Sequence, residues 1–206
     1  MAYSDFTVGK VKQAFGIQTI EGKMFFPAVA PVAPSSTLLE VLEETLPLAV
    51  ALPSEKAKSE LLISPILVEV RKYLKRQVSL FSGQDFTVDA SVGLTGICDF
   101  LISGSTEQLE IESPVVVLVE AEKADINSRM GQCMAEMVAV QQFNQNTGRQ
   151  PKPVYGCVTS GILWRFLKLE GKQMTVDLKD YFLDPLSDLL GKLVWMCSDR
   201  EVIDNA

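Results

Sequence analysis

The chain has 206 residues, of which 47% are hydrophobic and 22% are charged, as in an ordinary globular protein rather than a disordered one. At roughly 150 residues per domain, this length predicts one domain with an appendage. The formal net charge of −7 at pH 7 argues against a dedicated nucleic-acid coat, which is usually rich in basic residues.

The sequence contains no histidine, which excludes triads with a His base and zinc sites with His ligands. No signal-peptide pattern begins the chain, and no apolar run approaches about 18 residues. We therefore expect a cytoplasmic protein without a membrane segment. Its cysteines lack the Cys-x-x-Cys spacing and are typical of reduced core thiols (Cys98, Cys133, Cys157, Cys197).

Residues 1–53 differ from the rest and are predicted to form an N-terminal arm. Three prolines within residues 26–34 are incompatible with a regular helix or a central strand. Short helices are predicted over Asp5–Gly16 and from Ser36 or Thr37 to Pro47. We expect this apolar arm to wrap the main domain, residues 54–206, or to bind a partner subunit, including a second copy in a homodimer.

The domain begins with a predicted helix over Ser54–Arg76, which Pro65 is expected to kink. Its apolar residues follow one stripe at helical spacing, and Glu60 lies at the edge of that stripe. Strands are then predicted at 86–92, 94–103 and 115–122, a helix at 127–144, strands at 154–159, 163–169 and 174–176, and a helix at 185–197. This order predicts an α/β fold with a mixed central β-sheet flanked by helices.

Carboxylates gather where two of these strands are expected to be neighbours. Asp99 lies in the second strand, and Glu120 and Glu122 end the third, on one face because side chains alternate along a strand. Converging carboxylates repel one another unless a cation neutralises them, and hard oxygen ligands suit Mg²⁺ or Mn²⁺. Such a metal activates water without histidine. The alternative is a set of exposed carboxylates at strand ends.

Four motifs in this order resemble the restriction-endonuclease-like, or PD-(D/E)XK, nuclease superfamily. They are S-E-L-L-I-S-P-I-L, C-D-F, V-V-V-L-V-E-A-E-K and G-Q-C-M-A-E-M. Residues 154–161 and the following W-R-F are similar to its uncharacterised and type I restriction-subunit-like branches. The resemblance covers residues 54–198. It implies an αβββαβ core and hydrolysis of phosphodiester bonds in nucleic acid with Mg²⁺ or Mn²⁺.

The resemblance also implies roles for individual residues. Asp99 and Glu120 match the metal ligands, and the backbone carbonyl of Ala121 would complete the metal site. Glu60 matches the first-helix Glu that supports metal or water. Gln132 matches a helix Gln of the exonuclease-like members, although Glu136 stands where those members often have Tyr.

One departure concerns the lysine of the family motif, whose place is taken by Glu122. Lys123 follows one residue later, and a shift of one residue turns a side chain to the opposite face of a strand. Lys123 is therefore expected at the site only through a bulge or because the strand has ended. A Glu-x-Glu-Lys site of this kind leaves enzymatic activity open.

Three hypotheses for function remain. The first is a Mg²⁺-dependent nuclease, and the second is a catalytically inactive nuclease-fold protein that acts as a binding or regulatory module. The third is a subunit whose basic surface comes from a partner protein. The basic cluster after the first helix either contacts phosphates or interacts with the dipole of that helix (Arg71, Lys72, Lys75, Arg76).

Overall fold

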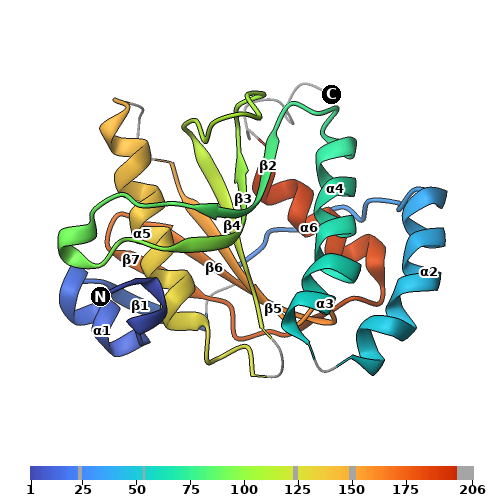
Figure 1. Cartoon of the computed structure of the whole chain (residues 1–206), viewed down its shortest axis with the longest axis horizontal. Coiled ribbons are helices and arrows are strands. Elements are labelled where there is room, and N and C mark those ends of the chain that lie inside the picture. Colours follow the sequence, from blue (N-terminus) through green and yellow to red (C-terminus); the bar gives the residue numbers. More distant parts are fainter. Residues whose placement is uncertain (23–24, 53, 123–124, 149–151, 199–206) are drawn as a thin grey trace.

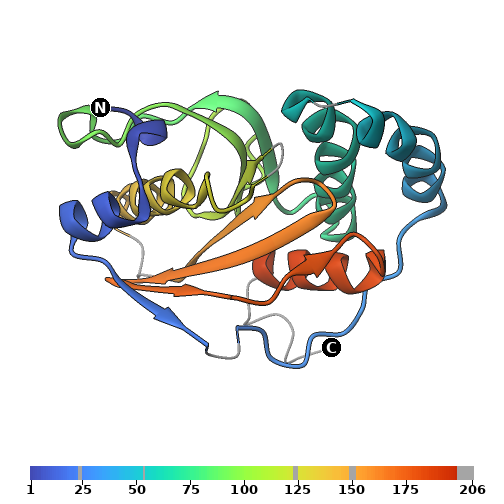
Figure 2. The same ribbon diagram turned by 90° about the horizontal axis from the view of Figure 1, so that it is seen from below.

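The computed structural model describes residues 1–22, 25–52, 54–122, 125–148 and 152–198. In these residues a mixed β-sheet lies between two layers of helices (Figures 1 and 2). The helices are α1 (Val8–Phe15), α2 (Ser36–Ala51), α3 (Glu55–Lys58), α4 (Ser64–Tyr73), α5 (Met130–Asn146) and α6 (Leu186–Cys197). The strands are β1 (Gln18–Glu21), β2 (Ser79–Asp85), β3 (Ile97–Ser103), β4 (Val115–Ala121), β5 (Val154–Thr159), β6 (Leu163–Glu170), β7 (Gln173–Val176) and β8 (Tyr181–Phe182). The α/β class with a mixed central sheet is confirmed.

The sheet has the strand order β1-β7-β6-β5-β4-β3-β2 in the described part of the chain, and β8 pairs with β6. Strands β2, β3 and β4 are antiparallel neighbours. Strand β5 runs parallel to β4, because α5 carries the chain back across one face of the sheet. The carboxyl ends of β4 and β5 therefore lie side by side at one edge.

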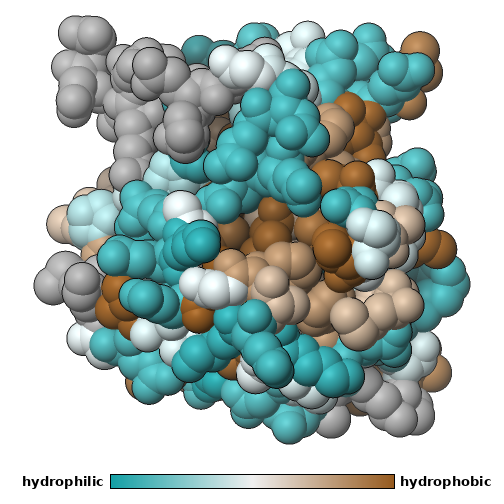
Figure 3. Space-filling model, turned by 90° about the vertical axis from the view of Figure 1, so that its left-hand side faces the viewer, coloured by the Kyte–Doolittle hydropathy of each residue, from teal (hydrophilic) through white to brown (hydrophobic). Residues whose placement is uncertain are grey.

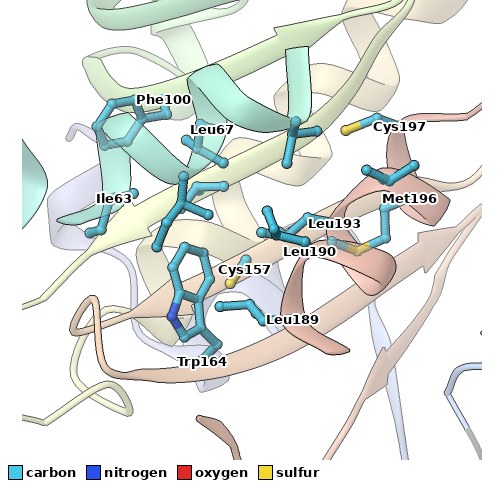
Figure 4. Close-up of a cluster of buried hydrophobic side chains, with 14 of the residues drawn as sticks. Ile63, Leu67, Phe100, Cys157, Trp164, Leu189, Leu190, Leu193, Met196 and Cys197 are labelled. Atoms are coloured by element: carbon cyan, nitrogen blue, oxygen red, sulfur yellow. The ribbon is translucent and has the colours of Figure 1, made fainter. Parts of the chain in front are cut away.

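Hydrophobic cores fill both faces of this sheet. On one face the segment from α3 to α4 and helix α6 pack against the strands, and Figure 4 shows their apolar side chains meeting there. On the other face α5 and α1 cover the sheet, with Met134, Met137 and Val140 completely buried. Both faces of β5 are buried, which explains its apolar sequence.

The first 53 residues contribute to both cores. Strand β1 extends the sheet by pairing in parallel with β7. Tyr3, Phe6 and Val11 are buried in the core beneath α5, whereas Phe25 and Phe26 are buried in the core beneath α6. The apolar side chains that predicted an arm thus pack within the chain itself.

The expectation of a homodimer was based on an exposed apolar arm, and much of this arm packs within the chain. Self-association therefore stays a prediction without that support. Apolar side chains do remain exposed on α2, for example Leu48 and Val50. Figure 3 shows an apolar area, bordered by hydrophilic residues, on the side of the molecule that is at the left in Figure 1.

None of the described helices combines the length and the apolar character needed to cross a membrane.

The strand predicted over residues 86–92 is wrong. Strand β2 ends at Asp85, and the chain then forms a loop with a short 3-10 helix at Ala90–Val92. The Tyr3 hydroxyl donates a hydrogen bond to Phe86 O (2.6 Å), and the Phe86 ring packs on Phe143. The apolar side chain of Phe86 is therefore explained by its packing against α5, whereas Val92 is exposed.

The helix predicted to end at Pro47 continues to Ala51. Its amino-terminal cap is Ser35, whose hydroxyl accepts a hydrogen bond from Leu38 N. The turn after Pro47 buries Ala49 completely. This packing offsets the hydrogen bond that a proline removes from a helix.

The helix predicted over Ser54–Arg76 corresponds to the segment Glu55–Tyr73, called here the α3–α4 segment. Between α3 and α4 it contains a π-helical turn at Ser59–Ile63, which ends two residues before Pro65. Pro65 has no N–H, so the Leu61 carbonyl lacks its ordinary helical partner. The Thr45 hydroxyl donates to that carbonyl (2.7 Å). Helix α2 thus satisfies the backbone group that the proline leaves free.

Candidate functional site

Asp99 of β3 and Glu120 of β4 lie side by side at the edge where β4 and β5 end. The register pairs Phe100 with Val119, which makes Asp99 and Glu120 neighbours across the two strands. Asp99 N donates to Glu120 Oε1 (3.3 Å), and Ala121 N donates to Asp99 Oδ2 (2.8 Å). Each carboxylate is thus held by the backbone of the neighbouring strand.

Two residues of α5 face this pair. Gln132 Nε2 donates to Glu120 Oε2 (2.7 Å) and to Glu136 Oε1 (3.0 Å). Glu120 and Glu136 have no exposed surface, and Glu136 Oε2 is buried without a hydrogen-bond partner among the described residues. A buried carboxylate oxygen without a donor is costly unless it gains a proton or a cation.

Burial controls the protonation of these groups. It raises the pKa of Glu136 to about 8, with a further upward contribution from the charge of Asp99. Burial, together with the neighbouring Glu136, also raises the pKa of Glu120 well above its ordinary value. The pKa of Asp99 is raised by burial as well, although the Ala121 N–H opposes this shift. The site therefore favours neutral carboxyl groups or a nearby positive charge.

Arg129 supplies such a charge at the start of α5. Its Nε donates to Glu122 Oε2 (3.1 Å), its Nη2 to Glu55 Oε2 (3.1 Å) and its Nη1 to Gln132 Oε1 (2.8 Å). The Gln132 carbonyl thereby faces Arg129, and its NH₂ group faces Glu120 and Glu136. The carboxylates of Glu55, Asp99, Glu120, Glu122 and Glu136 are called here the acidic cluster.

Glu122 is fixed by further contacts at the end of β4. Its backbone N donates to Thr159 O of β5 (2.7 Å), and the Ser128 hydroxyl donates to its Oε2 (2.8 Å). Glu122 thus joins the acidic cluster through Arg129 and Ser128. Lys123, the displaced lysine of the motif, lies outside the described residues.

The structure does not place Glu60 among the carboxylates of the acidic cluster. Its side chain is 61% exposed and forms an ion pair with Lys56 (3.0 Å). The π-helical turn adds one residue to a helical turn, which rotates the preceding residues by about 100° relative to an unbroken α-helix. Glu55, which precedes the turn, contacts Arg129, whereas Glu60 lies within the turn and faces solvent.

The predicted basic cluster lies far from the acidic cluster. It lies in the last turn of the α3–α4 segment and just beyond it, at the top of Figure 1, whereas Glu55 begins that segment. Sixteen residues separate Glu55 from Arg71, about 24 Å of helix. Arg71 Nε donates to Val78 O (3.0 Å), and Lys72 lies 3.6 Å from Glu69. Lys75 and Arg76 are exposed. Arg71 and Lys72 thus have structural partners of their own.

The donor chemistry of the site fits a hard divalent cation. Asp99 and Glu120 offer carboxylate oxygens, the Ala121 carbonyl is part of the same strand end, and Glu136 Oε2 is an orphaned buried oxygen. In the described part of the chain, no three Asp, Glu or Cys side chains are arranged to hold a metal together. Two carboxylates and several waters are a usual ligand set for Mg²⁺, so the fit concerns this smaller set.

Comparisons with known proteins do not assign the chain to a family. No protein-family model matches the sequence, and no curated protein matches it. The residues themselves therefore carry the functional argument. Two of them, Glu55 and Arg129, were not predicted from the sequence.

Proposed function

We propose that the chain is a Mg²⁺- or Mn²⁺-dependent phosphodiesterase that acts on nucleic acid and has a restriction-endonuclease-like core. The main observation in support is that Asp99 and Glu120, which are 21 residues apart in the sequence, lie next to each other at the carboxyl end of β4. The succession of α4, three antiparallel strands, α5 and a parallel strand supports the proposed family core.

Asp99, Glu120 and the Ala121 carbonyl would hold the metal. When bound, the metal supplies an electrophile for a phosphate oxygen and lowers the pKa of bound water. Gln132 orients Glu120 by donating to its Oε2. Glu136 keeps a second buried acid within reach of Gln132, where it can retain a proton near neutral pH.

Cleavage assays test the proposal directly. Supercoiled plasmid DNA and structured RNA are incubated with wild-type protein and Asp99→Asn in Mg²⁺, Mn²⁺ or EDTA. We expect metal-dependent cleavage by wild type and a loss of about 100-fold or more in Asp99→Asn, since metal charge stabilisation is worth several kcal/mol. Glu40→Gln, an exposed acid on α2, is the matched control and should keep wild-type activity. If wild-type protein cleaves neither substrate in Mg²⁺ and neither in Mn²⁺, the proposal is contradicted.

A second candidate function is favoured by a different observation. Arg129 forms ion pairs with Glu55 and Glu122, and Gln132 donates hydrogen bonds to Glu120 and Glu136, so the acidic cluster already has partners within the chain. The alternative is therefore a nuclease-fold protein that binds or regulates a partner without cleaving nucleic acid. Titration calorimetry with Mg²⁺ and Mn²⁺ separates the two functions. Metal binding that is lost in Asp99→Asn supports the nuclease, whereas the alternative predicts no such binding.

A further inference from the structure

Arg129 lies at the boundary between the buried acids and solvent. Its side chain is 31% exposed, and it is held at the amino-terminal end of the 17-residue helix α5. Glu55, Glu122 and Gln132 fix it from three elements, namely α3, the end of β4 and α5. A long side chain fixed in this way loses little further freedom when it binds a ligand.

A phosphodiester is an anion, and the acidic cluster repels it. The whole chain adds to this repulsion with its net charge of −7. A positive charge at the cluster is therefore required before a phosphate can approach the carboxylates. Arg129 is a cation in direct contact with Glu55 and Glu122, and the basic cluster, which begins at Arg71 in the last turn of α4, lies about 24 Å of helix away.

The guanidinium has hydrogen-bonding capacity to spare. Among the described residues its Nη1 donates to Gln132 Oε1 alone, which leaves the second N–H of that nitrogen for an anion. This N–H can donate a charge-assisted hydrogen bond to one phosphate oxygen, and the amino-terminal dipole of α5 favours negative charge at the same place.

We propose that Arg129 binds the phosphate of the substrate, and that Glu55 and Glu122 hold its guanidinium in place. The inference rests on the proposed nuclease function and assigns Glu122 to Arg129 rather than to the metal. Arg129 then balances the negative charge beside the proposed metal ligands without taking a coordination position. Its contact with Gln132 joins phosphate binding to the orientation of Glu120.

The test measures DNA binding, metal binding and cleavage in the same variants. A fluorescein-labelled DNA duplex is titrated with protein in Ca²⁺, Mg²⁺ binding is measured by calorimetry, and cleavage is followed in Mg²⁺. For Arg129→Ala we expect unchanged or tighter Mg²⁺ binding, duplex affinity lowered about tenfold or more, and cleavage lowered about 100-fold. Arg129→Lys keeps the charge without the planar fork and should fall between wild type and Arg129→Ala.

Lys168→Ala is the matched control. Lys168 is also a partly buried, ion-paired cation (2.7 Å from Glu170), but it faces Tyr155 at the opposite end of β5. It should bind and cleave as wild type does. If wild type cleaves and Arg129→Ala binds and cleaves equally well, the inference is overturned and the proposed function stands. If wild type neither binds Mg²⁺ nor cleaves, the proposed function fails and the inference fails with it.

Discussion

Glu136 sets an expected pH dependence of stability at the scale of a single residue. Burial raises its pKa from 4.5 to about 8, so the folded state binds a proton that the unfolded state releases. The free energy of unfolding should therefore be highest near pH 4.5 and fall as the pH rises towards 8, by about 1.4 kcal/mol per pH unit for each such proton. Urea denaturation in EDTA at the two ends of this range measures the slope.

Glu136→Gln replaces the acid by a neutral side chain of the same shape. It should flatten the slope and stabilise the protein at the alkaline end, because a buried negative charge no longer forms. Glu40→Gln on α2 is the control and should retain the wild-type slope. A wild-type stability that does not change between pH 4.5 and 8 would show that the Glu120 and Glu136 pair binds no extra proton on folding.

The sequence predicted the meeting of Asp99 and Glu120, because apolar neighbouring strands leave few possible registers. It did not predict Glu55. A helical wheel assumes 3.6 residues per turn, and the π-helical turn at Ser59–Ile63 breaks that count just before Pro65. The proline inside an apolar helix was the available signal. Arg129 gave no periodic signal, since it lies where a connecting loop meets α5.

At the scale of elements, Thr45 is expected to hold the α3–α4 segment to α2. Its hydroxyl donates to the Leu61 carbonyl, which Pro65 leaves without a helical partner. Thr45→Val keeps the shape but leaves this partly buried carbonyl unsatisfied, and should lower the free energy of unfolding by about 1–3 kcal/mol. Urea denaturation measures the loss. Thr37→Val, at an exposed position of the same helix, should change stability by less than about 0.5 kcal/mol.

Elements with a clear apolar pattern were the predictable ones. Strand β5, a continuous apolar run, and helix α6, which has an apolar stripe, lie within a residue of their predicted bounds. Residues 86–92 have the same alternation as a strand, but the Phe86 carbonyl accepts a hydrogen bond from the Tyr3 hydroxyl and the Phe86 ring packs on Phe143 of α5. The spacing of apolar residues along the chain predicts which side chains are buried. It does not predict which distant segment of the chain packs against them.

At the scale of the whole molecule, residues 1–53 pack against helices on both faces of the sheet through glycines. A β-carbon on Gly131 of α5 would overlap Phe6 O and lie 2.6 Å from Thr7 Cα. A β-carbon on Gly191 of α6 would overlap Ala30 O. Backbone cannot move aside as a flexible side chain can, so these contacts require glycine.

Gly131→Ala and Gly191→Ala should therefore each destabilise the whole chain, by about 1–3 kcal/mol for an overpacked contact. Gly9→Ala in α1 is the control, because its nearest neighbour, Thr7 Oγ1, lies at 4.0 Å and alanine favours a helix. Urea unfolding is followed by circular dichroism and by tryptophan fluorescence from Trp164 and Trp195. An integral amino-terminal region gives one coincident transition that both alanine variants shift to lower urea. A detachable arm would instead leave the transition of the remaining domain where it is in wild type.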